Sequence, residues 1–375
     1  MPRYVKALVK EIRDFRSLNV HTIYLGGGTP SIVPIESLKE IFSALRDSFS
    51  LTADPEISFE ANPEDSTPEY LEGLRGSGIN RLSFGVQSAN ANELTLFNRS
   101  HTFEDAQRAI HNAREAGFEN VSVDLIFGIP QQTMTSWQDT LKRTLDLAPD
   151  HFSIYSLSLD FGTPMRAWVM RGLLPEPDPD LAADMYEWGD EELGRCGFEQ
   201  YEISSWKKSQ NPKIPTSKAL ESPREASNLQ LPITNYECKH NLQYWHNDSY
   251  LGLGAGAHGY VNEHRYSNVM SPTAYISRME SGDAKQFPFS PALSESNSVD
   301  RKTEMDETML TGMRLTKEGV GFERFRKRFG VGIEEVYAKE IGELKERGLI
   351  EADDECVRLT KGGRLVANWV FEKFV

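Results

Sequence analysis

Hydrophobic and polar positions alternate with two different periods over roughly the first 160 residues of the chain. Short apolar runs, typical of buried strands, are separated by longer stretches in which apolar residues recur every three or four positions, as in amphipathic helices. The predicted strands span residues 21–25, 56–61, 81–86, 121–127 and 151–159. The predicted helices between them span residues 5–15, 35–49, 68–76, 103–116 and 136–147.

This alternation predicts an α/β fold with parallel strands, because each crossover between parallel neighbours needs a connecting element, usually a helix. One strand–helix unit takes about 25–40 residues, which suits a barrel of the (β/α) type. A doubly wound sheet is the other arrangement that satisfies the pattern.

Glycine and polar residues gather where the predicted strands end. The first strand runs into Gly26-Gly27-Gly28-Thr29, where glycines let backbone groups approach a ligand closely; alone, this motif also fits a tight turn. The polar residues in or after the later strands are Glu60, Asn62, Gln87, Ser88, Asp124 and Asp160. A carboxylate in a buried strand costs several kcal/mol unless it is paired, and active sites of β/α barrels lie at the carboxyl ends of strands. The coincidence therefore favours a barrel with a ligand site.

The rest of the chain divides into two further parts. Residues 166–297 contain a linker, a helix at 181–196 and, at about 207–233, a segment rich in Pro, Ser, Lys and Asn that we interpret as a mobile surface insertion. Residues 298–375 combine helices with short strands, which predicts a small winged-helix-like domain. Its basic amphipathic stretch at 322–329 is typical of a packed helix with a solvated face. The predicted domains are therefore 1–165, 166–297 and 298–375.

A second group of chemically versatile residues lies at 238–245, with the sequence Cys-Lys-His-Asn-Leu-Gln-Tyr-Trp. Imidazole and thiolate are usual axial ligands of haem iron, and Tyr and Trp present flat rings that stack on a macrocycle. The alternative is an ordinary core histidine beside two core aromatic residues. In the following glycine-rich run, 251–259, the third glycine is displaced from the dinucleotide-binding pattern. We interpret that run as a close-packed turn that brings backbone, and His258, to a pocket.

Composition narrows the class of protein. The 375 residues carry a formal net charge of −15, which argues against broad binding to nucleic acids or anionic membranes. No apolar run reaches the length of a membrane span, so peripheral contact is the one membrane association left open. The cysteines, Cys196, Cys238 and Cys356, lie far apart, and the first residues lack the apolar core of a secretion signal. We expect a cytoplasmic protein in a reducing compartment.

Five motifs follow one another along the chain, at residues 26–30, 60–63, 80–88, 124–130 and 252–258. In this order and spacing they resemble the oxygen-independent coproporphyrinogen III oxidase family of radical S-adenosylmethionine (SAM) proteins. The element His240-Asn241-x-x-Tyr244-Trp245 resembles the haem-chaperone branch of that family. The resemblance covers essentially the whole chain except the insertion near 207–233.

The resemblance implies a partial (β/α)6 barrel, similar to a TIM barrel, that holds SAM. The SAM-binding residues that it implies are Gly27, Gly28, Thr29, Glu60, Gln87, Arg99 and Asp124. In the haem-chaperone branch, haem binding is attributed to the His-Asn-x-x-Tyr-Trp element, so the resemblance makes His240 the expected ligand of the haem iron. It makes Tyr244 and Trp245 the walls of the haem pocket. The candidates for a second axial ligand are Cys238, His246 and His258.

One departure from the family pattern bears on the chemistry. The family holds a 4Fe–4S cluster through a Cys-x3-Cys-x2-Cys motif before its first helix, and no cysteines of this chain have that spacing. We therefore expect the chain as given to lack the first barrel strand and the cluster loop, to bind no cluster and to perform no reductive cleavage of SAM. We also expect its sheet to begin with an unpaired edge strand, which is an aggregation hazard.

Three hypotheses about function follow. The first is a haem chaperone that binds haem near His240 and passes it to an acceptor protein, which the sequence does not identify. The second is an enzyme of porphyrin biosynthesis, a radical SAM oxidase that decarboxylates coproporphyrinogen III, and it requires cluster ligands that this chain lacks. The third is a degenerate barrel that keeps SAM binding without chemistry.

Overall fold

The computed structural model describes residues 1–375 except 16, 210–234 and 284. The described residues form two compact units, each built from segments that are far apart in the sequence. Unit 1 comprises Met1–Phe59, Glu72–Asn80 and Cys238–Val375, and unit 2 comprises Glu60–Leu71 and Arg81–Glu237. The insertion predicted at 207–233 lies outside the described residues from position 210 onward.

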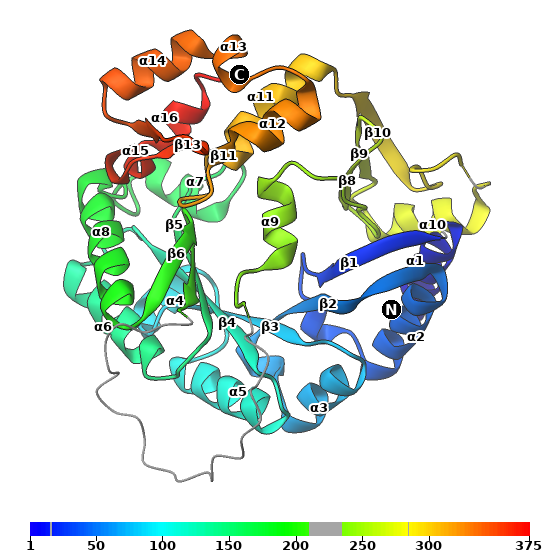
Figure 1. Ribbon diagram of the computed structural model, residues 1–375. Coiled ribbons are helices and arrows are strands. Elements are labelled where there is room, and N and C mark those ends of the chain that lie inside the picture. The colour runs from blue at the N-terminus through cyan, green and yellow to red at the C-terminus, as the bar shows by residue number, and fades with distance from the viewer. Residues whose placement is uncertain (16, 210–234, 284) are drawn as a thin grey trace, which may run out of the picture. The chain divides into compact units, whose positions relative to one another are not determined.

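Unit 1 combines elements from both ends of the chain (Figure 1). Its N-terminal elements are α1 (Pro2–Asp14), β1 (Leu18–Leu25), the 3₁₀ turn η1 (Pro30–Ile32), α2 (Ile35–Ser48) and most of β2 (Phe49–Ala61), and it shares α3 (Pro68–Gly76) with unit 2. Its later elements are α9 (Lys239–Trp245), β8 (His258–Val261), β9 (His264–Asn268), α10 (Pro272–Ser281), β10 (Leu293–Ser298), α11 (Arg301–Gly312), β11 (Val320–Gly321), α12 (Phe322–Phe329), α13 (Ile333–Val336), α14 (Ala338–Glu346), β12 (Ile350–Ala352), β13 (Cys356–Leu359), α15 (Lys361–Leu365) and α16 (Ala367–Phe371).

The two N-terminal strands of unit 1 pair in parallel, and β1 lies at the edge of its sheet with β2 as its one strand neighbour in the described part of the chain. The register shifts between Val20 and Thr22, whose partners on β2 are Leu51 and Glu56. The intervening residues of β2 therefore bulge away from the ladder. Pro55 is tolerated there, because a proline in a bulge is not required to donate a ladder hydrogen bond.

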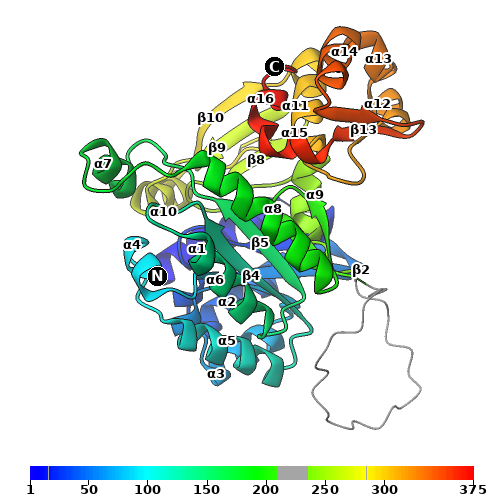
Figure 2. The same ribbon diagram turned by 90° about the vertical axis from the view of Figure 1, so that its left-hand side faces the viewer.

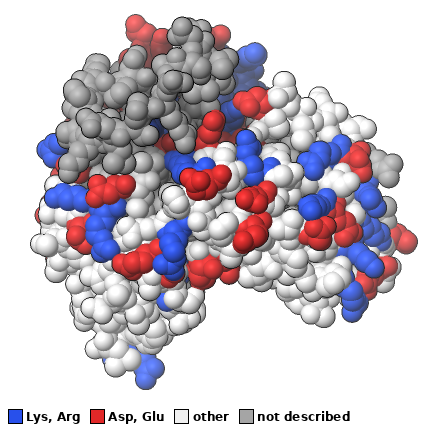
Figure 3. Space-filling view, turned by 90° about the horizontal axis from the view of Figure 1, so that it is seen from below, with Lys and Arg blue, Asp and Glu red and all other residues white. Residues whose placement is uncertain are grey.

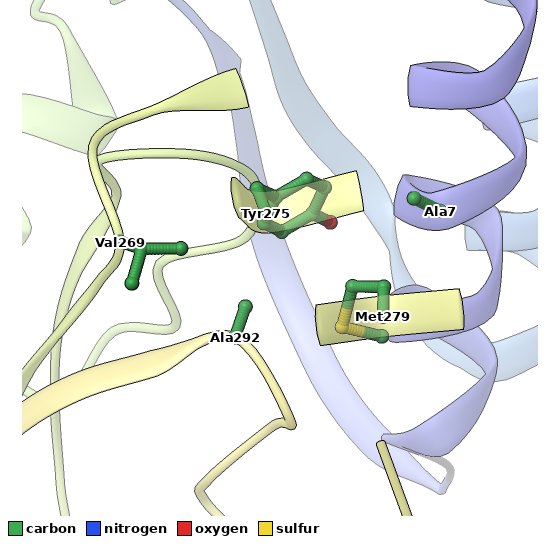
Figure 4. Close-up of a cluster of buried hydrophobic side chains, with 5 residues drawn as sticks. All are labelled: Ala7, Val269, Tyr275, Met279 and Ala292. Carbon is green, nitrogen blue, oxygen red and sulfur yellow. The ribbon is translucent and has the colours of Figure 1, made fainter. Parts of the chain in front are cut away.

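Within unit 1, the helix α1 packs against α10. Its buried stripe contributes Ala7 to a cluster with Val269, Tyr275, Met279 and Ala292, which come from the region of α10 and its flanking segments (Figure 4). Burial of such side chains contributes about 1.5–3 kcal/mol each for the larger ones. The N-terminal helix is thereby tied to a segment more than 250 residues away in the sequence.

One charged residue, Glu11, lies on the same buried stripe of α1. Its carboxylate accepts hydrogen bonds from the backbone N–H of Gly254 (2.7 Å), the side-chain amide of Asn268 (2.8 Å) and the hydroxyl of Tyr275 (2.7 Å). Burial raises the pKa of Glu11, and these hydrogen bonds oppose that shift. The network fixes the glycine-rich run against α1.

The C-terminal part of unit 1 contains two antiparallel sheets, with strand orders β10-β9-β8 and β11-β13-β12. The second sheet is accompanied by the helices α11 to α16. The expectation of a mainly helical C-terminal part is confirmed, with short strands at the predicted place around residue 357.

Unit 2 is built on the parallel strands β3 (Arg81–Gln87), β4 (Asn120–Phe127) and β5 (His151–Ser156), followed by the antiparallel hairpin β6 (Phe198–Glu202) and β7 (Ser205–Lys208). Its helical elements are η2 (Pro63–Asp65), α4 (Ala91–Leu96), α5 (Phe103–Glu115), α6 (Met134–Leu145), α7 (Pro164–Met170) and α8 (Pro179–Arg195). Figure 2 shows α6 and α8 covering the same side of the strands, and α8 contacts β4 and β6.

The predicted alternation of strands and helices is confirmed, since each predicted strand corresponds to one of β1 to β5. The predicted second strand begins too late. β2 starts at Phe49, whereas the prediction assigned its first residues to the preceding helix and its loop. The predicted fifth strand is too long, because β5 ends at Ser156 rather than at residue 159.

Two surface observations bear on partners. None of the helices that the structure describes is long and apolar enough to cross a membrane. On the face seen in Figure 3, basic and acidic side chains are interspersed, without a continuous basic surface among the described residues of that face.

Candidate functional site

The helix α9 carries the His-Asn-x-x-Tyr-Trp element and is held at its N-terminus by a buried carboxylate of β2. Glu56 accepts hydrogen bonds from the backbone N–H groups of Lys239 (2.9 Å) and His240 (3.0 Å), and Ser58 Oγ donates to the same carboxylate (3.2 Å). A negative charge at this end of a helix satisfies N–H groups without intrahelical partners and interacts favourably with the helix dipole. Glu56 therefore determines where His240 lies.

The C-terminal end of α9 is held by Arg328 of α12. Its guanidinium donates to the backbone carbonyls of His246 (3.2 Å) and Asn247 (2.7 Å) and forms an ion pair with Glu304 (2.6 Å). A cation is favourable at a helix C-terminus, where carbonyl groups lack partners. Both ends of α9 are thus fixed by side chains of other elements of unit 1.

The imidazole of His240 is held on both of its nitrogen atoms. Nδ1 lies 2.9 Å from Oγ1 of the buried Thr22, and Nε2 lies 2.9 Å from the hydroxyl of Tyr244. The ring stacks on Tyr24, with centroids 4.9 Å apart and an interplanar angle of 14°. Burial raises the pKa of Tyr244 to about 12, so its hydroxyl is neutral at physiological pH. The result is a histidine oriented by two residues of β1 and one of α9.

His240 and Tyr244 line a cavity of about 540 Å³ in unit 1. The cavity follows β1 along its length, and Gly26, Tyr250 and His258 also contribute to its walls. Its remaining walls are mainly aliphatic and aromatic. This size and this mixture of apolar walls with a few polar groups are typical of small-molecule and cofactor sites.

The glycine-rich run beside the cavity is packed too closely for larger residues. A Cβ atom added to Gly252 would lie 2.0 Å from the backbone oxygen of His258, and one added to Gly259 would lie 2.2 Å from the ring of Tyr266. The prediction of a close-packed turn that brings His258 to a pocket agrees with this geometry.

The candidates for a second axial ligand differ in where the structure places them. Cys238 is fully buried, with Sγ 3.6 Å from the carboxylate of Glu56. His246 lies 3.1 Å from both carboxylate oxygens of Glu318 and lines a different, far smaller cavity. Of these candidates, His258 shares the large cavity with His240.

Trp245 does not line the large cavity. Its ring lies under the guanidinium of Arg314, 4.4 Å from the ring centroid, and it borders the same small cavity as His246. Of the two aromatic residues expected to form haem-pocket walls, the structure therefore brings Tyr244, but not Trp245, to the cavity of His240.

The glycine motif predicted to bind SAM follows β1 in unit 1. Gly27 and Gly28 have φ angles of +79° and +66°, and a Cβ atom added to either would meet nothing within 4 Å. Positive φ values explain the need for glycine, and both residues are exposed. Thr29 follows directly and precedes η1.

The carboxylate Asp124 lies within β4 in unit 2 and accepts a hydrogen bond from Ser83 Oγ (3.0 Å). Burial raises the pKa of Asp124 to about 6, the hydrogen bond from Ser83 opposes that shift, and the charge of Glu60 adds to it. A carboxyl group whose pKa is displaced in this way is a candidate for a binding site.

Gln87 and Arg99 converge beside Asp124. Gln87 ends β3 in the left-handed region (φ +64°), and a Cβ atom added to Gly85 would lie 2.8 Å from its Nε2 and 4.0 Å from Nη2 of Arg99. Gly85 is the register partner of Asp124 across the sheet. Arg99 also donates to the side chain of Asn62 (3.4 Å). Unit 2 thus brings together Glu60, Gln87, Arg99 and Asp124, and unit 1 separately holds the glycine motif and His240.

Sequence reasoning did not identify Glu56, Thr22, Tyr24 or Arg328. For Glu56 the sequence did carry a signal, because an acidic residue at the start of a predicted buried strand needs a polar or charged partner. The other residues carry no local signature, because their roles arise from contacts with α9 and the residues that follow it, between 81 and 218 positions away in the sequence.

The residues present do not fit a 4Fe–4S cluster. Such a cluster needs several cysteine thiolates together, whereas Cys196, Cys238 and Cys356 are far apart in the sequence. Within the ranges described, no group of three or more His, Cys, Asp or Glu side chains is arranged to hold a metal ion.

Comparison with known proteins defines the class first. Residues 2–144 match the model of the radical SAM superfamily, and residues 299–366 match that of the HemN C-terminal domain. The solved structure of coproporphyrinogen III oxidase (HemN) from Escherichia coli, a radical SAM enzyme, superposes with a TM-score of 0.77, covering 100% of this chain and 82% of that chain at 22% identity. The expected fold, a partial β/α barrel of the TIM type, is confirmed, and at this identity the likeness extends to fold alone.

The particular family follows from sequence relatives. The haem chaperone HemW of Lactococcus lactis is 33% identical over 99% of this chain and 89% of its own length. That of Bacillus subtilis is 34% identical over 99% of this chain and 91% of its own length. This chain belongs to the HemW family, and the resemblance found in the sequence is confirmed.

Proposed function

We propose that this protein is a haem chaperone that binds haem through His240 and transfers it to an acceptor protein. The observation that carries the proposal is the oriented imidazole of His240 on the wall of a cavity of about 540 Å³. The names of its relatives, haem chaperones at 33–34% identity over nearly the whole chain, support the same function.

The chemistry of the cavity suits haem as cargo. A neutral imidazole is a common ligand of haem iron, and apolar walls favour the flat hydrophobic macrocycle over water. Tyr24 stacks on His240 and Tyr244 packs edge-on against it, so both add aromatic surface beside the imidazole. His258 is the proposed second ligand, because it shares the cavity while Cys238 and His246 are engaged elsewhere.

Haem titration followed by the Soret band tests this assignment. We expect His240→Ala to weaken binding by at least tenfold and to change the spectrum, while His258→Ala changes the spectrum with a smaller loss of affinity. His111→Ala is the matched control, because His111 is exposed on α5 in the other unit. Identical spectra and affinities for the wild type and His240→Ala would exclude His240 as the ligand.

Transfer is tested by mixing the haem-loaded protein with apomyoglobin as a generic acceptor. We expect complete transfer, at a rate that His258→Ala increases if that side chain ligates the iron. Retention of haem by the loaded protein over hours would argue for storage rather than transfer.

We also propose that the scaffold binds SAM. Two groups are each suited by themselves to a polar part of SAM: the exposed backbone of Gly27 and Gly28 in unit 1, and the side chains around Asp124 in unit 2. Equilibrium dialysis with SAM tests this, and binding that Asp124→Ala does not weaken would contradict it. The separated cysteines fit our further proposal of a cytoplasmic location, which fractionation of cells would check.

A further inference from the structure

We infer that the hydroxyl of Tyr244 is a built-in competitor for the iron-binding nitrogen of His240, and that Thr22 is the residue that positions the ring for ligation. This inference rests on the proposed function. It adds a closed state of the empty site, in which His240 is protected, and an open state, in which Nε2 is free to bind iron.

The closed state follows from the spacing on α9. His240 and Tyr244 are four residues apart, so their side chains lie on the same face of the helix. The hydroxyl of Tyr244 reaches Nε2 at 2.9 Å, while Nδ1 is bonded to Thr22 at 2.9 Å. Iron can bind only a nitrogen whose lone pair is free, so one of these two hydrogen bonds must break.

Burial decides which bond breaks. Thr22 is buried on β1, and its hydrogen bond is backed by the stacking of His240 on Tyr24. Tyr244 lines the cavity and packs edge-on against Tyr250, which also lines it, with ring centroids 4.6 Å apart. Thr22 also lines the cavity, but it is buried, and its hydroxyl is carried on a short β-branched side chain with a single χ angle. The hydroxyl of Tyr244 lies at the end of a longer, half-buried side chain, so Tyr244 moves and Thr22 stays.

The hydrogen bond between Thr22 and Nδ1 of His240 resembles the bond that commonly orients a metal-binding histidine. A histidine that ligates a metal through one nitrogen usually donates the N–H of the other to an oxygen, which fixes the tautomer and the ring orientation. Oγ1 of Thr22 is placed to accept from Nδ1–H of His240. In the tautomer in which Nδ1–H donates to Thr22, Nε2 carries the lone pair, and the hydroxyl of Tyr244 caps that lone pair until haem arrives.

The test uses the full chain, haem and three substitutions. Tyr244→Phe keeps the ring and removes the competing hydroxyl, and we expect roughly 3- to 10-fold tighter haem binding with the same final spectrum, from the net worth of one hydrogen bond. Thr22→Val removes the outer-shell acceptor, and we expect weaker binding. We also expect a lower Fe–His stretching frequency in the resonance Raman spectrum of the five-coordinate ferrous form, obtained in the His258→Ala background. Thr22→Ser restores the hydroxyl and should restore both properties.

Tyr236→Phe is the matched control, because Tyr236 precedes α9 and does not line the cavity. Unchanged or weaker binding by Tyr244→Phe would overturn the competitor role, and an unchanged Fe–His stretch in Thr22→Val would overturn the positioning role. Both failures are distinguishable from failure of the proposed function, in which His240→Ala itself leaves haem binding intact. In the apoprotein, the ¹⁵N shift of Nε2 should change in Tyr244→Phe, which checks the closed state without haem.

Discussion

Replacing Asp124 with asparagine is expected to increase the free energy of unfolding at neutral pH. Burial raises the pKa of this carboxyl from 3.8 to about 6, and the charge of Glu60 adds to the shift against the opposing hydrogen bond from Ser83. The ionised form is therefore less favourable in the folded chain than in the unfolded one. Asparagine retains an oxygen that accepts from Ser83 but carries no charge.

The sign and the size follow from proton linkage. Between about pH 4 and 6 the folded protein binds more protons at Asp124 than the unfolded chain does, so its contribution to stability falls as the pH rises through that window. A pKa raised from 3.8 to about 6 corresponds to about 3 kcal/mol, at about 1.4 kcal/mol per pKa unit. Because the new amide group needs acceptors of its own, we expect Asp124→Asn to gain about 1–3 kcal/mol above pH 7, and about half of that near pH 5.

Urea titrations of the wild type and Asp124→Asn at pH 8 and pH 5 measure this difference. Asp139→Asn serves as the control, because Asp139 is an exposed carboxylate of α6 in the same unit. A gain of equal size at both pH values, or a variant less stable than the wild type at pH 8, would refute the reasoning. If Asp124 also binds SAM, the more stable variant should bind it less tightly, a cost of the kind expected at a functional site.

Other substitutions test the framework of unit 1. Glu11→Ala leaves three buried donors without their acceptor, and we expect a loss of about 3–5 kcal/mol in urea titrations; a loss below about 1 kcal/mol would contradict the network. Gly252→Ala places a Cβ 2.0 Å from the backbone oxygen of His258 and should lower the thermal midpoint of unfolding. In the control Gly342→Ala, the new Cβ meets nothing within 4 Å, and the free energy of unfolding should rise by about 0.5–1 kcal/mol. Arg328→Ala should accelerate amide hydrogen exchange in α9 at least tenfold, and unchanged exchange would show that the anchor is dispensable.

The sequence was informative wherever structure is set by local pattern. Strands β3 and β4 were predicted to within a residue or so, because apolar residues recur at every second position in each, at 82, 84 and 86 and at 121, 123, 125 and 127. The beginning of β2 was missed, since Asp54-Pro55 reads as a turn unless the register shift opposite Val20 is known. Pairing information of this kind is absent from a single strand's composition.

In the candidate site, too, the residues marked by a local pattern were predictable and those placed by the tertiary fold were not. His240 and Tyr244 stand out because reactive and aromatic side chains are crowded into one short segment. Trp245 belongs to the same segment, but the helix turns it toward Arg314, since adjacent residues of a helix point about 100° apart. Thr22 and Glu56 are ordinary strand residues in the sequence, and only the tertiary fold brings them to His240.

The shortness of α9 has a consequence for how this protein can be dissected. A helix of seven residues does not persist in water on its own, because nucleation costs more than so few internal hydrogen bonds return. Its two anchors come from opposite ends of the chain, Glu56 near the beginning and Arg328 near the end. A fragment trimmed to the segments that line the cavity would therefore lose His240 as an ordered side chain. The C-terminal part, residues 298–375, therefore stabilises the pocket through Arg328, although none of its described residues lines the cavity.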